Sequence, residues 1–159
     1  MTYMDRPFSA RRRAQQDPTG AVPETREMLV VVVEDDVRLS DAFRNVCDCL
    51  NVAVERIPSW DDLGATLRKR RPMAVVAEFD AAGQDGCNVL MTIATYDRDL
   101  PVLLMTGEDP AVLGAIDAVE ELYELSSLDK WPELLGVGAV VDFLFRAGRK
   151  GSCMRLMAV

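Results

Sequence analysis

The sequence contains no histidine, no Cys-x-x-Cys pair and no long hydrophobic segment. Without histidine, neither a histidine-based catalytic triad nor a phosphohistidine can form, and the four cysteines support neither a zinc site nor a thioredoxin-like redox pair. The longest apolar run, residues 28–33, is far shorter than the roughly 20 residues that span a bilayer. No apolar stretch follows the first charges, as a secretory signal would require. We therefore expect a cytoplasmic protein with reduced cysteines and no membrane partner.

The charge balance is acidic, with 18 Lys and Arg against 26 Asp and Glu and a net charge of −8. Broad affinity for nucleic acid is not expected from such a chain. Residues 1–27 lack a sustained apolar period and predict a flexible arm. This arm contains the run Arg11-Arg12-Arg13, so a DNA-binding regulator is one alternative, although no helix-turn-helix segment is left over to read bases.

After this arm, apolar runs typical of strands alternate with helical patterns. Five strands alternating with five helices predict an α/β fold with a doubly wound parallel sheet in a domain spanning residues 28–149, followed by a tail of residues 150–159. Ser59 and Asp62 resemble a capping box at a helix start, and Pro72 ends that helix. The expected strands cover residues 29–33, 52–57, 73–77, 101–105 and part of 123–131, and the expected helices cover residues 39–50, 59–71, 87–96, 110–122 and 137–149.

Acidic and hydroxyl side chains follow three of the expected strands. Glu34 and Asp35 follow the first strand, Glu78 and Asp80 the third, and Thr106 the fourth. Sites in such sheets form at the carboxyl ends of the strands, so these side chains should gather at one edge. Because carboxylate oxygens suit a hard cation, Glu34, Asp35 and Glu78 predict a Mg²⁺ site. We expect weak binding centred on Asp35, since three carboxylates repel one another.

Four motifs resemble those of the receiver domain of bacterial response regulators, over about residues 28–149. They are VVVEDD at 31–36, GQDG at 83–86, PVLLMTG at 101–107 and a Lys130-x-Pro132 pair. The resemblance implies a flavodoxin-like fold of five parallel strands. It also implies that Glu34 and Asp35 bind Mg²⁺, that an Asp ending the third strand accepts phosphate from a histidine kinase, and that Thr106 and Lys130 contact the phosphoryl group.

The phospho-acceptor position departs from this pattern, because Glu78 stands eight residues before Gly86 where the family has Asp. We therefore expect that the protein is not phosphorylated in the usual way, and Asp80 is the alternative acceptor. Further departures are Ala82 in place of a proline, Ser127 in place of an aromatic residue three before Lys130, and Trp131 between Lys130 and Pro132.

The resulting hypothesis is a stand-alone atypical receiver that acts through protein contacts in two-component signalling and is not an enzyme. Its expected partners are a sensor histidine kinase or a downstream signalling protein, and residues 110–149 are the expected surface for docking or homodimer formation. Trp131, Leu134, Leu135 and Val137 form an apolar cluster that either marks this contact or packs as a loop. The acid-x-acid pair Glu78 and Asp80 leaves a haloacid dehalogenase-like phosphatase as the enzymatic alternative.

Overall fold

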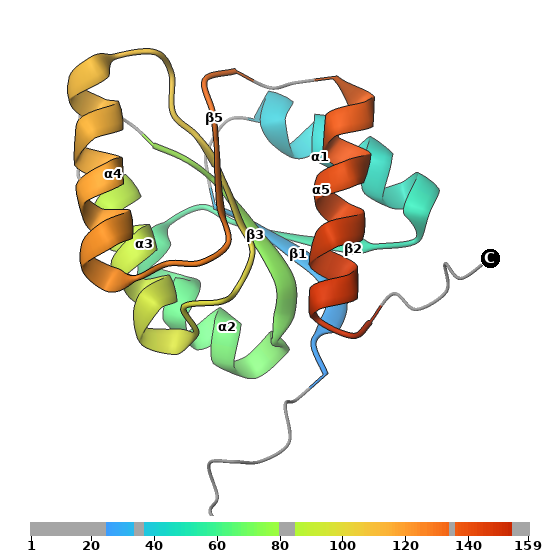
Figure 1. The fold of residues 1–159 in the computed structure, drawn as a ribbon. Helices are drawn as coiled ribbons and strands as arrows, with labels where there is room; N and C mark the ends of the chain where they lie inside the picture. Colours follow the sequence, from blue (N-terminus) through green and yellow to red (C-terminus); the bar gives the residue numbers. More distant parts are fainter. Residues whose placement is uncertain (1–24, 34–36, 80–84, 134–135, 154–159) are drawn as a thin grey trace, which may run out of the picture.

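The computed structural model describes residues 25–33, 37–79, 85–133 and 136–153. Strands and helices alternate along this part of the chain (Figure 1). In chain order the elements are β1 (Glu27–Val33), α1 (Val37–Leu50), β2 (Ala53–Ile57), a 3-10 turn η1 (Trp60–Asp62), α2 (Leu63–Arg70), β3 (Pro72–Glu78), α3 (Asp85–Tyr96), β4 (Val102–Met105), α4 (Pro110–Tyr123), β5 (Leu128–Trp131) and α5 (Val137–Lys150).

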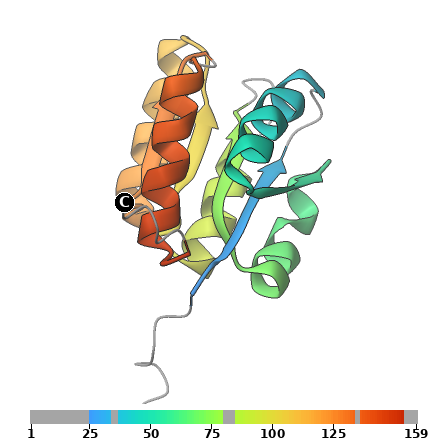
Figure 2. The ribbon, with the colours of Figure 1, turned by 90° about the vertical axis from the view of Figure 1, so that its right-hand side faces the viewer.

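The five strands form one parallel sheet in the order β2-β1-β3-β4-β5, with β1, β3 and β4 in its interior. The interior strands are unbroken apolar runs because helices cover both of their faces. Figure 1 and Figure 2 show these helices on either side of the sheet. The doubly wound α/β fold expected from the sequence is thereby confirmed, and β5 lies within residues 123–131, where the sequence predicts the fifth strand.

Each face of the sheet has its own core. Side chains of α2, α3 and α4, such as Leu67, Ile93 and Ile116, pack on one face. Side chains of α1 and α5, such as Phe43 and Leu144, pack on the other. Successive residues of a strand point to opposite faces, so neighbouring valines of β1 contribute alternately to the two cores.

Local signals determine where the helices begin and end. The Asp109 carboxylate accepts a hydrogen bond from the Ala111 amide, and Pro110 occupies the first turn, which together start α4. Arg71 adopts a left-handed conformation with φ 48° after α2, and Pro72 then opens β3. Ser59 caps a turn as predicted, but it accepts from the Asp61 amide of η1, and α2 begins only at Leu63.

The helices in the described ranges are all too short or too polar to cross a membrane.

The predicted helix at 137–149 extends one residue further, to Lys150. The first strand begins at Glu27, inside the segment predicted as an arm, because the Glu27 amide donates to the Arg71 carbonyl at 2.8 Å.

Candidate functional site

The parallel sheet brings the carboxyl ends of β1, β3, β4 and β5 to one edge, which is where the sequence predicts a site. Glu78 is the last residue of β3 and lies level with Met105, the last residue of β4. The six preceding residues of β3 are buried, whereas Glu78 is exposed. The buried strand therefore ends with the Glu78 carboxylate at the surface of this edge.

Three of the predicted site residues, Glu34, Asp35 and Asp80, lie outside the described residues. Glu78, Thr106 and Lys130 lie within them. The described residues contain no group of three cysteine or carboxylate side chains placed to hold a metal ion. The Mg²⁺ site therefore stays a prediction, for which Glu78 supplies an exposed carboxylate of the right chemical type.

Thr106 is 4% exposed and links the ends of β4 and β5. Its amide donates to the Trp131 carbonyl at 2.7 Å. Its hydroxyl Oγ1 lies 2.8 Å from the Gly107 carbonyl oxygen and 3.3 Å from that of Trp131. Because a hydroxyl has one proton to donate, the closer Gly107 carbonyl is its main acceptor. A ligand at this edge would have to compete with backbone for the Thr106 proton.

Within the described residues, Lys130 forms its ion pairs with a helix and not with Glu78 or Thr106. Its Nζ lies 2.8 Å from Asp117 Oδ1 and 2.6 Å from Glu120 Oε1, both on α4. Hydrogen bonds from Lys130 to Asp117 and Glu120 raise the pKa of the ammonium group against the opposing effect of burial. The sequence signal for this contact was the spacing of Asp117 and Glu120, which places both acids on one helix face.

The neighbouring residue Trp131 points to the opposite face of the sheet. It is 7% exposed and packs with the residues of α1 and α5. Of the predicted apolar cluster, Trp131 is thus part of the core, Val137 is 67% exposed, and Leu134 and Leu135 lie outside the described residues. Trp131 is therefore not available as a contact surface.

Phe79 is a structural residue of this edge that sequence reasoning missed. Its amide donates to the Met105 carbonyl at 2.8 Å, which continues the sheet one step beyond Glu78. Its ring lies against Gly86, where a Cβ atom would come within 2.0 Å of Phe79 Cδ2. The GQDG motif contained the signal, because a glycine inside a helix often permits the close approach of another group.

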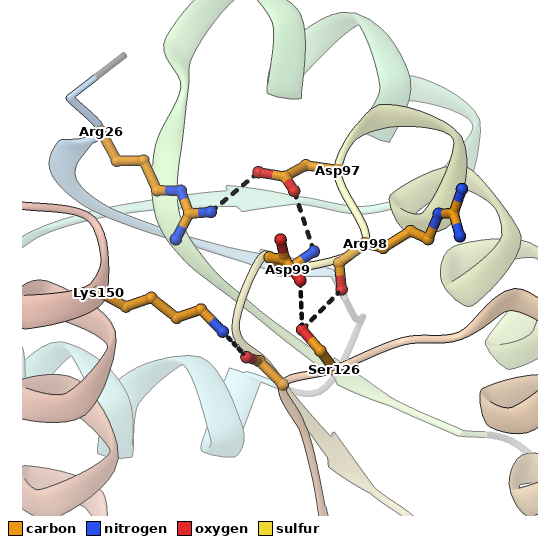
Figure 3. Close-up of polar contacts among 7 residues, drawn as sticks. Arg26, Asp97, Arg98, Asp99, Ser126 and Lys150 are labelled. Carbon is orange, nitrogen blue, oxygen red and sulfur yellow. Dashed lines mark hydrogen bonds and ion pairs between the residues drawn. The ribbon is translucent and has the colours of Figure 1, made fainter. Parts of the chain in front are cut away.

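The opposite edge of the sheet holds a polar network that the sequence also did not reveal (Figure 3). Arg26 Nη2 lies 2.9 Å from Asp97 Oδ2, and Asp97 Oδ1 accepts from the Asp99 amide. Ser126 donates to Asp99, and Lys150 donates to Ser127. These residues precede β1, β4 and β5 or end α5, so the network joins chain segments at the amino ends of the strands, away from Glu78 and Thr106.

No family model matches the chain. The C4-dicarboxylate transport transcriptional regulatory protein DctD of Pseudomonas aeruginosa is 28% identical over 113 residues, or 67% of this chain. The match covers 24% of that protein, so the chain spans about a quarter of the length of this curated relative.

Solved receiver domains share the fold. The beryllofluoride-activated NtrC receiver domain is 21% identical with a TM-score of 0.58, covering 77% of this chain and 94% of that one. A response regulator receiver domain from Bermanella marisrubri is 19% identical with a TM-score of 0.60, covering 77% and 98%. The chain therefore shares the α/β fold of these receiver domains and is similar in sequence to part of a transcriptional regulatory protein.

Proposed function

We propose that this chain is an atypical receiver of two-component signalling, which acts by binding another protein and does not accept a phosphoryl group at the end of β3. The observation that supports this proposal is the exposed Glu78 at the last position of β3, where the resemblance implies an aspartate. A glutamate carries its carboxylate one methylene further from the backbone. It also supplies permanently the kind of negative charge that an aspartyl phosphate would supply only after reaction with a kinase.

The partners of Thr106 and Lys130 support the same proposal. The Thr106 hydroxyl donates to the Gly107 carbonyl, and the Lys130 ammonium group is bound to two carboxylates of α4. Contacts of these two side chains with a phosphoryl group would require both sets of bonds to be exchanged. Their predicted role at the phosphoryl group stays a prediction.

Incubation of the full chain with a small acyl phosphate and Mg²⁺, followed by intact mass measurement, tests the proposal. We expect the mass of the parent protein to remain unchanged. A stoichiometric gain of one phosphoryl group would contradict the proposal. In that case the Asp80→Asn variant tells whether Asp80 is the acceptor, and the Glu78→Asp variant measures whether an aspartate at the end of β3 accepts phosphate.

We propose further that Glu34, Asp35 and Glu78 bind Mg²⁺ weakly, with Asp35 as the principal ligand. Carboxylate oxygens are the donors that Mg²⁺ prefers, and without a phosphoryl group the three negative charges repel one another. Titration calorimetry of the parent against Asp35→Asn tests the assignment. Equal Mg²⁺ affinity in the two proteins would place the site elsewhere.

The proposed contact surface is the face formed by α4, β5 and α5, for docking a sensor kinase, a downstream signalling protein or a second copy of the chain in the cytoplasm. Leu122 on α4 is 71% exposed and Val137 at the start of α5 is 67% exposed, so both helices present a large apolar side chain to solvent. If Glu78 mimics the phosphorylated state, Glu78→Gln should weaken self-association or partner binding. Unchanged association would leave Glu78 as a tolerated replacement without a mimetic role.

A further inference from the structure

Lys130 joins β5 to α4 by two ion pairs. Its Nζ lies 2.8 Å from Asp117 Oδ1 and 2.6 Å from Glu120 Oε1. The two acids are three residues apart, so they lie on one face of the helix. A single ammonium group between them balances both charges and also reduces the repulsion that the two carboxylates would otherwise exert on each other.

These ion pairs are partly shielded from water. The side chains of Lys130 and Glu120 are 29% and 28% exposed, and Asp117 on the outer side is 65% exposed. Ion pairs that are partly withdrawn from solvent are screened less than fully exposed pairs. The raised pKa of Lys130 is consistent with a positive charge that the two acids hold in place.

The ion pairs act on the half of α4 that has no buried side chain. Val112 and Ile116, the buried residues of this helix, lie in its first two turns. Beyond Ile116 no side chain of α4 is fully buried, and Val119 and Tyr123 pack against the core while remaining partly accessible to solvent. By contrast, the buried residues of α5 extend from Val140 to Gly148, along most of that helix. The second half of α4 therefore depends more on Lys130 than α5 depends on any one polar contact.

We infer that Lys130 clamps the second half of α4 onto β5 and thereby fixes the geometry of the face that these two elements form. This face is part of the contact surface proposed above, so the regulatory meaning of the clamp rests on the proposed function. The clamp would keep this face in one arrangement, whether or not a phosphoryl group or Mg²⁺ is bound at the carboxyl ends of the strands. The ion pairs themselves involve neither Glu78 nor a phosphoryl group.

Hydrogen exchange on the full chain tests the clamp. We compare the parent with Lys130→Met, which removes the charge and keeps the length of the side chain, and with Lys130→Arg, which retains the charge. For Lys130→Met we expect amide exchange in residues 117–123 to accelerate by about 3- to 10-fold, with α5 and the first turns of α4 unchanged. Lys130→Arg should stay closer to the parent. Unchanged exchange in residues 117–123, or equal acceleration in all helices, would overturn the inference.

A second variant keeps the test decisive if Lys130→Met does not fold. Glu120→Gln removes one of the two acids and should accelerate exchange in the same residues by a smaller factor, whereas no local change would overturn the clamp. These measurements need neither a partner nor a phosphate donor. Faster local exchange in Lys130→Met, combined with phosphorylation of the parent protein, would support the clamp and contradict the proposed function. Unchanged exchange in Lys130→Met, combined with no phosphorylation of the parent protein, would contradict the clamp alone.

Discussion

The ring of Phe79 occupies the space that a side chain on Gly86 would need. A Cβ atom on Gly86 would lie 2.0 Å from Phe79 Cδ2 and 2.6 Å from Phe79 Cγ, which is the ring atom nearest the backbone. Since Cγ cannot move away without moving the whole side chain, the segment after β3 and the start of α3 are fitted to each other at these two residues. This contact lies next to Glu78, so substitutions at Gly86 and Phe79 test the packing at the carboxyl ends of the strands.

Gly86→Ala should destabilise the protein by about 1–3 kcal/mol, the usual cost of overpacking a filled space. The matched control is Gly114→Ala in α4, because a Cβ atom there meets nothing within 4 Å. The control should be neutral or gain up to about 1 kcal/mol from helix propensity. Urea unfolding measures both values. In a Phe79→Ala background, Gly86→Ala should lose most of its effect, and a persistent loss would mean that the ring is not the cause.

Arg26 and Asp97 should respond unequally to substitution. The Arg26 side chain is 14% exposed and pairs with Asp97 at 2.9 Å. Asp97→Asn would leave a largely buried guanidinium group without its counter-charge, which we expect to cost about 1–3 kcal/mol. Arg26→Met removes the charge itself and should cost less. Measured free energies of unfolding of the two variants test this prediction. A larger loss of stability for Arg26→Met than for Asp97→Asn would contradict it.

Cys47 should be inert in the folded protein and should make stability depend on pH in alkali. Burial, with a smaller contribution from the charge of Asp48, raises the pKa of the Cys47 thiol to about 12 from a reference value of 9.0. The folded state thus favours the neutral thiol. Its contribution to stability is complete below pH 9.0 and is lost as the pH rises toward about 12.

Thiol labelling of the native protein checks this prediction. Near pH 8, exposed Cys49 should react readily, whereas Cys47 should react only after unfolding. The Cys49→Ser variant serves as the control, because any fast labelling that remains in this variant must come from the other thiols. Equal labelling rates for Cys47 and Cys49 in folded protein would show that Cys47 is not protected as the structure indicates.

Thr106 should stabilise the protein through its hydroxyl. Thr106→Val keeps the shape of the side chain and removes the proton donated to the Gly107 carbonyl, which should cost about 1 kcal/mol. Thr106→Ser keeps the donor, so it should lose only what the missing methyl group contributes to packing. Thermal unfolding compares the two, and a valine variant as stable as the parent would mean that the hydroxyl bond contributes nothing.

The sequence was sufficient to locate Glu78 and Thr106, because the apolar runs of β3 and β4 end next to them and a parallel sheet brings strand ends together. It could not locate the Lys130 side chain. Only four residues form β5, and successive residues of a strand face opposite sides, so an error of one position exchanges the faces. Counting from buried Trp131 places Lys130 on the α4 side, but the burial of Trp131 was itself not evident from the sequence.

The polar network at the amino edge was unpredictable for a different reason. Arg26 and Asp97 are separated by 71 residues, and only the sheet topology brings them together. The sequence pattern indicates Pro72 as the end of a helix, and Pro72 also opens β3, because a proline is tolerated as the first residue of a strand. Local patterns thus predicted the elements and missed the contacts between distant loops.

The hydrogen bond from the Arg26 amide to the Gly151 carbonyl, 3.1 Å long, has a practical use. It holds the start and the finish of the described domain side by side at the edge remote from Glu78. A fluorophore pair attached near these two points would begin in close proximity and separate on unfolding. An affinity tag attached at either point would leave the strand-end edge open for measurements of phosphate, metal and protein binding.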